Sequence, residues 1–265
     1  MARRIVQRRS SDPSAWFQSF PVGPEPVRLN LVCFPYAGAG AVAFGRWRFR
    51  GVRVSAVRLP GREIRLHEPR YRDVREAALD LVLALEAARI TPPFCFFGHS
   101  LGALLAYEVC QNLLERGACL PTRLIVSGRA APQLPILTRL YTLPLSELKT
   151  VVAGYGGTPV NVLNAEYFGR ILLPVIRDDF EMAENYSHGQ RPVLPLPIDA
   201  LAGDQDPVAP RARVEAWRQV TSSEFSLRVF SGQHFFLHAH ESAVLEHVDS
   251  LIREGGARAP QRACS

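Results

Sequence analysis

Short, unbroken apolar runs alternate along the chain with longer segments whose apolar residues recur at helical spacing. A strand in a parallel sheet is buried on both faces and therefore reads as a continuous apolar run. Such runs occupy residues 28–34, 52–59, 93–98, 122–128, 196–203 and 225–230. Helical spacing is found at 73–89, 101–117, about 208–219 and about 240–253. This alternation predicts an α/β fold with a mostly parallel sheet and helices on both faces.

Two residues mark the ends of predicted helices. Asp73 is placed to cap the helix at 73–89, because its carboxylate can accept hydrogen bonds from the first free backbone amides. Gly117 can terminate the helix that begins at residue 101, since glycine tolerates the left-handed conformation common at helix ends.

One long stretch, between Arg129 and Pro195, breaks the alternation. It contains helical patterns such as LSELKTVVAG and AEYFGRILLPVIRDDFEMAENY. An insertion of this length between two strands usually has a function, and a lid over a binding site is the expected form. We therefore expect one domain over residues 1–255 with a lid insertion at about 130–195, and a disordered tail at 256–265.

Composition narrows the class of protein. The chain has 265 residues, of which 47% are hydrophobic and 21% are charged, as in an ordinary globular domain. No apolar stretch reaches the roughly 18 to 20 residues of a membrane span, and no apolar core follows the basic N-terminus as in a signal peptide. We therefore expect a cytoplasmic protein that does not bind membranes.

The formal net charge of +6 comes almost wholly from arginine, since Lys149 is the only lysine. The basic residues are dispersed, without the dense cluster typical of nucleic-acid binding, so we expect no nucleic-acid partner. The charge is interpreted as serving solubility, with docking of an acidic partner as the alternative.

The cysteines follow no pairing pattern. Their positions are Cys33, Cys95, Cys110, Cys119 and Cys264, an odd number with no C-x-x-C pair. The first three lie inside apolar segments, where cysteine behaves as a small hydrophobic residue. The pattern predicts neither a disulfide nor a metal site.

The motif Gly98-x-Ser100-x-Gly102 lies at the junction of a predicted strand and a predicted helix. A turn this tight tolerates only glycine at the flanking positions, and it holds the serine hydroxyl above the sheet edge. The amide of Leu101 at the helix N-terminus then faces any negative charge that develops on a substrate. We interpret Ser100 as a nucleophile; the alternative is a serine that only satisfies a turn.

A nucleophilic serine needs a histidine base and a carboxylate that orients the base. In strand-to-helix hydrolases the acid follows a late strand, where ALAGDQDPVAP supplies Asp204 and Asp206. Asp206, directly before Pro207, is the preferred candidate. Asp204 is interpreted as a turn or capping residue.

The base is expected after the last strand, where His234, His238 and His240 follow one another. His234 comes first, in a loop that begins with glycine, and is the preferred base. His238 and His240 are expected to begin the last helix; a metal site with Glu241 is the alternative, and we expect no metal. We do not expect His99 to be the base, because its side chain starts beside the serine and points elsewhere.

The second oxyanion donor is expected in the loop CFPYAGAGA after the first buried strand. Ala37 is the preferred backbone donor, together with Leu101, and Tyr36 is the competing choice. The same loop contains Gly38-x-Gly40-x-x-Ala43, a possible dinucleotide fingerprint. A ribose-binding acid should end the next strand, but that position carries Arg58.

With these residues identified, the chain resembles the type II thioesterases of polyketide and nonribosomal peptide assembly lines. It is also similar to the medium-chain thioesterase of animal fatty acid synthase. The resemblance runs from about Trp16 to the last helix and rests on LVCFPYAGAG, LPGREIRLHEP, FFGHSLGALLAYE, LPVIRDDFEMAENY, ALAGDQDPV and SGQHFFL. It implies an α/β-hydrolase fold with a helical lid and a triad of Ser100, Asp206 and His234. Ala39 departs from the pattern, since a glycine is common there.

The resemblance also implies what such an enzyme would do. It would hydrolyse misprimed or stalled acyl groups from the phosphopantetheine arm of carrier domains, without a metal or other cofactor. Separately, we expect the protein to be a monomer. The insertion would shape the acyl channel, with Phe168, Ile171, Leu172 and Phe180 as candidate lining residues; the alternative is that they only pack the lid. A general carboxylesterase or acyltransferase on the same fold is the competing function, followed by a dinucleotide-binding protein.

Overall fold

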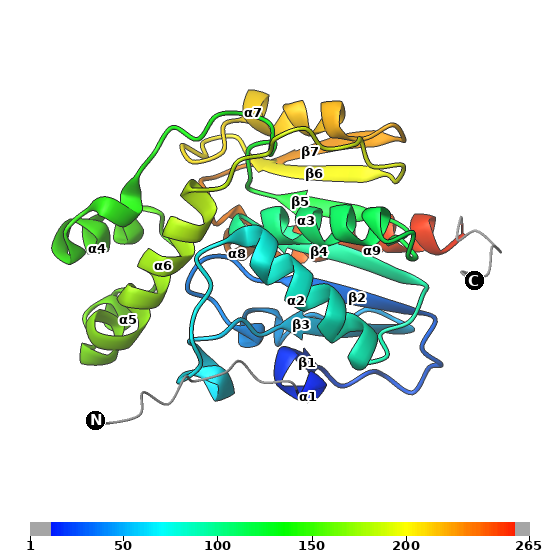
Figure 1. Cartoon of the computed structure of the whole chain (residues 1–265), viewed down its shortest axis with the longest axis horizontal. Coiled ribbons are helices and arrows are strands. Elements are labelled where there is room, and N and C mark those ends of the chain that lie inside the picture. Colours follow the sequence, from blue (N-terminus) through cyan, green and yellow to red (C-terminus); the bar gives the residue numbers. More distant parts are fainter. Residues whose placement is uncertain (1–11, 258–265) are drawn as a thin grey trace, which may run out of the picture.

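The computed structural model describes residues 12–257. Its centre is a seven-stranded sheet with the strand order β1-β3-β2-β4-β5-β6-β7 (Figure 1). Neighbouring strands are parallel except β1, which pairs antiparallel with β3. The strands are β1 (Phe17–Ser19), β2 (Leu29–Phe34), β3 (Val52–Val57), β4 (Phe94–His99), β5 (Leu124–Ser127), β6 (Ile198–Gly203) and β7 (Phe225–Phe230). The predicted α/β fold with a mostly parallel sheet is confirmed.

Helices connect the strands and carry the predicted end signals. The α-helices are α1 (Pro13–Trp16), α2 (Val74–Ala87), α3 (Leu101–Glu115), α4 (Leu145–Gly154), α5 (Val160–Leu163), α6 (Leu173–Glu184), α7 (Arg211–Glu215), α8 (Phe236–Ala239) and α9 (Glu241–Ala257). Short helical turns are η1 (Ala41–Phe44), η2 (Glu63–Arg65), η3 (Leu140–Thr142), η4 (Phe168–Leu172) and η5 (Ala216–Val220). Asp73 caps α2 by accepting hydrogen bonds from the amides of Arg75 (2.7 Å) and Glu76 (2.9 Å). Gly117, at φ +63°, follows the end of α3.

Three elements differ from the sequence pattern. The pattern does not predict β1, a strand of only three residues that extends the sheet beyond β3. The helix expected at about 208–219 is divided into α7 and η5. Helix α9 continues to Ala257, past the start of the expected disordered tail, and the rest of that tail, residues 258–265, lies outside the described residues.

Side chains that alternate along the strands build a core on each face of the sheet. On one face Val32, Phe34 and Phe96 pack with α2 and α3. On the other face Leu31 and Phe97 pack with η1, α8 and α9. Both faces are therefore covered, as the unbroken apolar strands predict.

The cysteines behave as expected at three positions and differ at one. Cys33, Cys95 and Cys110 are buried free thiols, and burial raises the pKa of Cys95 to about 12. Cys119 is disulfide-bonded, so the expectation of no disulfide is wrong. An odd number of scattered cysteines carries no sequence signal for this bond.

The insertion, which we define as residues 128–197 between β5 and β6, carries α4, α5, η4 and α6. Because β4 and β5 are parallel, it leaves the sheet at the same edge at which Ser100 follows β4. In Figure 1 it lies to the left of the sheet, with α6 nearest and α4 and α5 farther out. The insertion has a hydrophobic cluster of its own, formed by Leu148, Val152, Leu163, Phe168, Leu173 and Ile176.

Over residues 12–257, no helix is both long enough and apolar enough to cross a membrane.

Candidate active site

Ser100 occupies a strained turn between β4 and α3. Its backbone has φ 53° and ψ −115°, a region that residues with a side chain rarely adopt. Both flanking glycines are required by close backbone approach. A Cβ on Gly98 would lie 2.3 Å from the carbonyl oxygen of Gly102, and a Cβ on Gly102 would lie 1.9 Å from that of Phe34. The sequence from Gly98 to Gly102 thus forms the sharp elbow that its pattern predicts.

Asp206 and His234 form a buried pair on the loops that follow β6 and β7. His234 Nδ1 lies 2.8 Å from Asp206 Oδ2, and the two residues are 3% and 4% exposed. The other carboxylate oxygen of Asp206 accepts hydrogen bonds from the amides of Val208 (2.8 Å) and Ala209 (3.1 Å). The carboxylate is therefore fixed in a single orientation toward the imidazole.

Asp204 makes a different kind of contact. Its Oδ1 accepts a hydrogen bond from the amide of Gly232 (2.8 Å), in the loop that carries His234. Its own amide donates to Phe230 O, and the side chain is exposed. Asp204 thus ties two loops together, in agreement with its interpretation as a turn residue.

The other histidines near the predicted site, His99, His238 and His240, do not pair with Asp206. His99 is fully buried, with Nδ1 2.9 Å from Ser127 Oγ, and burial lowers its pKa well below the usual range. It is neutral and packs beneath His234, the two ring centroids being 5.0 Å apart. His238 Nε2 lies 3.1 Å from Tyr36 Oη. His240 is exposed between α8 and α9. Among residues 12–257, no three His, Cys, Asp or Glu side chains are grouped to hold a metal ion.

The backbone amides of the loop after β2 are partly occupied. The Gly38 amide donates to Asp179 Oδ2 (2.7 Å), and the Ala39 amide donates to Tyr36 O (3.0 Å). Within the described residues, the Ala37 amide makes no hydrogen bond. The Ala37 amide is therefore free to donate, and Ala37 lines the same cavity as Ser100 and Leu101, the first residue of α3.

A cavity of about 300 Å³ lies beside the serine, the histidine and the backbone donors. Its lining includes Ser100, Leu101, Ala37 and His234. The insertion supplies most of the apolar wall, through residues Leu134, Ile136, Leu137, Leu140, Val152, Tyr155, Ile176, Phe180 and Ala183. The wall supplied by the insertion is thus mostly apolar, with Arg129, Thr138, Thr158 and Glu184 as polar members, and it leads to the serine, an arrangement that fits an acyl chain ending in a reactive carbonyl.

Of the four residues proposed to line an acyl channel, only Phe180 lies at this cavity. Phe168 is fully buried in the cluster of the insertion, and Leu172 packs against the same cluster. Ile171 is half-buried and also lies away from the cavity. A signal for the wall was present in α6, because Ile176, Phe180 and Ala183 recur at the i, i+4, i+7 spacing of one helix face.

Tyr155 brings the insertion over the base. It follows α4, and its ring centroid lies 5.8 Å from that of His234. Burial raises its pKa to about 12, so the phenol is neutral. The backbone of Gly157 lies against Phe235: a Cβ at Gly157 would be only 2.3 Å from the Phe235 ring.

The possible dinucleotide fingerprint has a different structure. A dinucleotide site needs a long helix that begins at the glycine loop and directs free amides at a pyrophosphate. Here the loop leads into η1, a 3-10 helix of four residues. The Asp179 carboxylate accepts from the Gly38 amide, where it would repel a phosphate.

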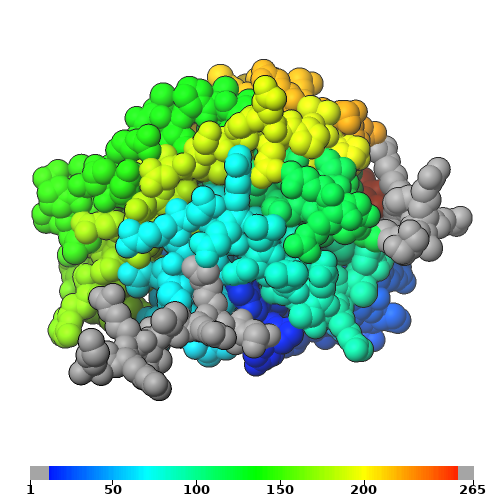
Figure 2. All heavy atoms as spheres, viewed as in Figure 1, coloured from blue at the N-terminus to red at the C-terminus, as the bar shows by residue number. Residues whose placement is uncertain are grey.

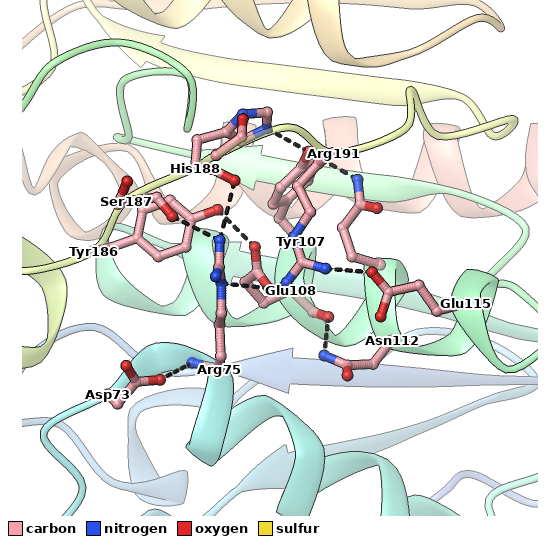
Figure 3. A network of polar contacts seen from close by, with 12 residues as sticks. Asp73, Arg75, Tyr107, Glu108, Asn112, Glu115, Tyr186, Ser187, His188 and Arg191 are labelled. Carbon is pink, nitrogen blue, oxygen red and sulfur yellow. Dashed lines mark hydrogen bonds and ion pairs between the residues drawn. The ribbon is translucent and has the colours of Figure 1, made fainter.

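A second set of polar contacts fixes the segment that returns from α6 to β6 (Figure 3). Glu108, in the middle of α3, has a fully buried side chain that accepts hydrogen bonds from Tyr186 Oη (2.6 Å) and Arg191 Nη2 (2.7 Å). Beside it, Tyr107 Oη lies 2.9 Å from His188 Nε2. The helix that begins next to Ser100 therefore also holds the end of the insertion.

We expect Arg191→Met to lower the free energy of unfolding by about 3 kcal/mol, because it removes the nearer cation of the buried Glu108 carboxylate and leaves, among the described residues, only Arg75, whose Nε lies 4.0 Å away. Chemical denaturation measures the change. Adding Glu108→Gln should restore part of it, since the buried charge is then removed as well. The matched control is Arg170→Met: Arg170 and its partner Glu166 are 76% and 78% exposed, so its effect should stay within about 0.5 kcal/mol. Equal losses in both variants would contradict the role of burial.

The sheet, the serine elbow and the cavity define an α/β-hydrolase-type protein. Residues 29–252 match the thioesterase domain family, and the chain belongs to this family. Thioesterase PikA5 of Streptomyces venezuelae is 37% identical over 250 residues, covering 93% of this chain and 89% of that protein.

Two solved structures share the fold. RedJ, a thioesterase of the prodiginine pathway of Streptomyces coelicolor, superposes with a TM-score of 0.82 at 40% identity, covering 87% of this chain and 94% of RedJ. BorB, a type II thioesterase from the borrelidin cluster, superposes with a TM-score of 0.80 at 34% identity, covering 93% of this chain and 99% of BorB. The resemblance to type II thioesterases is confirmed, and the protein is a thioester hydrolase.

Proposed function

We propose that this thioesterase hydrolyses acyl groups from the phosphopantetheine arm of carrier proteins, and so clears misprimed or stalled chains from a biosynthetic assembly line. The observation that carries the proposal is the cavity in which Ser100 and the Asp206–His234 pair meet an apolar wall. The relatives support the setting, since RedJ and BorB are named for biosynthetic pathways. Action in the cytoplasm, as a monomer, stays a prediction.

Each residue has a defined role in the proposed reaction. Ser100 Oγ attacks the thioester carbonyl carbon while His234 Nε2 accepts the hydroxyl proton. The amides of Ala37 and Leu101 donate hydrogen bonds to the oxyanion that forms. The carbon–sulfur bond then breaks, and the proton passes from His234 to the departing thiolate.

The acyl-serine is hydrolysed by the same groups. A water molecule gives one proton to His234 as its oxygen bonds to the acyl carbon, and collapse returns the proton to Ser100 and releases the acid. Asp206 keeps the imidazole in one tautomer and stabilises its cation in both halves. No step requires a metal or a bound cofactor.

The test compares three kinds of substrate with the same acyl group: an acylated carrier protein, an acyl-cysteamine thioester and a simple oxygen ester. The proposal expects the highest kcat/KM on the carrier, since only the carrier offers a protein surface as well as the arm. Faster turnover of the oxygen ester would instead favour the general carboxylesterase. Transfer of the acyl group to an added alcohol in preference to water would favour the acyltransferase.

The salt dependence of turnover should show whether the net charge of +6 serves carrier docking or only solubility. If the positive charge attracts an acidic carrier, we expect kcat/KM for the acylated carrier to fall about tenfold or more between about 0.05 and 0.5 M salt, because exposed charges are screened. The small acyl-cysteamine thioester should change less than about twofold. Equal salt sensitivity for both substrates would assign the charge to solubility.

A further inference from the structure

We propose that Asp179, together with Arg62, is a positioning residue that holds the oxyanion loop, which we define as residues 36–40. The inference rests on the proposed function of Ser100 and goes beyond it, because it gives α6 of the insertion a part in the chemistry. Asp179 touches no reacting atom. It acts through the backbone on either side of Gly38.

Hydrogen bonds connect Arg62 and Asp179 to each other and to the oxyanion loop. Arg62 Nη1 and Nη2 donate to Asp179 Oδ2 and Oδ1, both at 2.8 Å, in a bidentate pair. Asp179 Oδ2 also accepts from the Gly38 amide at 2.7 Å. Arg62 Nη1 donates in addition to Ala39 O at 3.0 Å. The pair therefore binds the loop at the Gly38 amide and the Ala39 carbonyl, which lie next to the free amide of Ala37 in the sequence.

Burial makes these contacts strong and directional. The side chains of Arg62 and Asp179 are 6% and 3% exposed, so water does not compete for their hydrogen bonds. Bidentate arginine–carboxylate pairs also restrict orientation more than a single contact does. A loop fixed in this way presents its donor before the substrate arrives, which is what stabilisation of an oxyanion requires.

Packing of α6 against the loop supports the same conclusion. Gly38 has φ +76°, and a Cβ at this position would lie 2.4 Å from Ile176 Cγ1. Ile176 and Phe180, which flank Asp179 in α6, line the cavity. One face of α6 thus forms the wall for the acyl chain and supports the loop.

Neighbouring ion pairs join α6 to the segment after β3, which contains Arg62. Arg70 pairs with Asp178, and Arg72 pairs with Glu181 at 2.8 Å. Figure 2 shows this segment, in cyan, in contact with the yellow-green surface of α6. Arg72 is 67% exposed, and within the described residues neither Arg72 nor Glu181 bonds to the oxyanion loop, so this pair provides a matched control.

The first experiment measures Asp179→Asn beside Glu181→Gln. We expect Asp179→Asn to lower kcat about 100-fold, as loss or misplacement of one oxyanion donor does, with KM changed less than about threefold. Glu181→Gln should stay within about twofold of the wild type. Rates are expressed per active site, counted by stoichiometric labelling with a fluorophosphonate, so that a misfolded fraction does not lower them.

A transition-state analogue supplies a readout that a purely structural role would not move. An acyl trifluoromethyl ketone adds to a serine and forms an oxyanion, whereas the matching thioether, with no carbonyl, binds only as a ground-state analogue. In Asp179→Asn the affinity for the ketone should fall by about the same factor as kcat/KM, and the affinity for the thioether should be retained. Equal losses for both ligands would overturn the proposal, as would a wild-type kcat per active site.

A double variant keeps the test valid if Asp179→Asn does not fold. Arg62→Met combined with Asp179→Leu removes both buried charges, a replacement that is often neutral for stability. The proposal expects a folded protein whose kcat stays about 100-fold low, because the bonds to Gly38 and Ala39 are lost. Recovery of kcat together with stability would show a structural role only. A failure of the proposed function itself would appear in the wild type, as turnover that the ketone does not inhibit.

Discussion

Ser100→Ala is expected to reduce thioester hydrolysis by about 10⁴- to 10⁶-fold while the protein stays folded. Removing the nucleophile of a serine–histidine–aspartate group leaves only substrate binding and the oxyanion donors to accelerate the reaction. Steady-state turnover of an acyl-cysteamine thioester measures the loss. A short acyl chain is preferred, because it separates the chemistry from docking of the carrier.

The control for Ser100→Ala is the wild-type protein incubated with a stoichiometric fluorophosphonate, which should label one residue and abolish turnover to the same extent. Circular dichroism and the thermal midpoint should show that the variant is folded. Near-normal hydrolysis by the folded variant would remove Ser100 from the mechanism.

The second large effect is expected at Asp206, where substitution by asparagine should lower kcat about 10⁴-fold. Asparagine preserves shape, but its amide cannot stabilise the imidazolium of His234, and it favours the wrong tautomer. Asp204→Asn should change kcat less than about tenfold, because Asp204 only joins two loops through the Gly232 amide. Both variants are assayed on the same thioester.

This pair of substitutions is closely matched, since the two aspartates are separated by one residue on the same loop. A severe loss in Asp204→Asn with a mild loss in Asp206→Asn would reverse the assignment of the acid. Similar losses in both would show that the loop acts as a unit, so that neither aspartate alone serves as the partner of His234.

Much of the fold follows from signals that are local in the sequence. Parallel strands appear as apolar runs because both faces of the sheet are covered, and the elbow is marked by two glycines that no larger residue can replace. The three-residue strand β1 carries no such pattern, because its place at the edge of the sheet depends on pairing with β3. Motifs in the sequence predicted the order serine, aspartate, histidine. Each of the three residues follows a parallel strand, and the carboxyl ends of parallel strands lie at the same edge of the sheet.

The wall of the cavity and the support of the oxyanion loop could not be read in the same way. Phe168 is an aromatic residue at helical spacing, but whether it faces the cavity or the cluster of the insertion depends on how η4 packs. The Arg62–Asp179 pair joins residues 117 positions apart. A single arginine among many identifies no partner at such a distance, and only the folded chain pairs the two.

The strained backbone of Ser100 lowers the folding stability of this part of the chain. A serine at φ 53° and ψ −115° is less stable than the same residue in an ordinary region by about 1 to 3 kcal/mol. Glycine would relieve this strain but would remove the hydroxyl. The neighbours in β2, β4 and β5 must therefore hold the turn in place, so substitutions that loosen these strands can impair the enzyme before they unfold it.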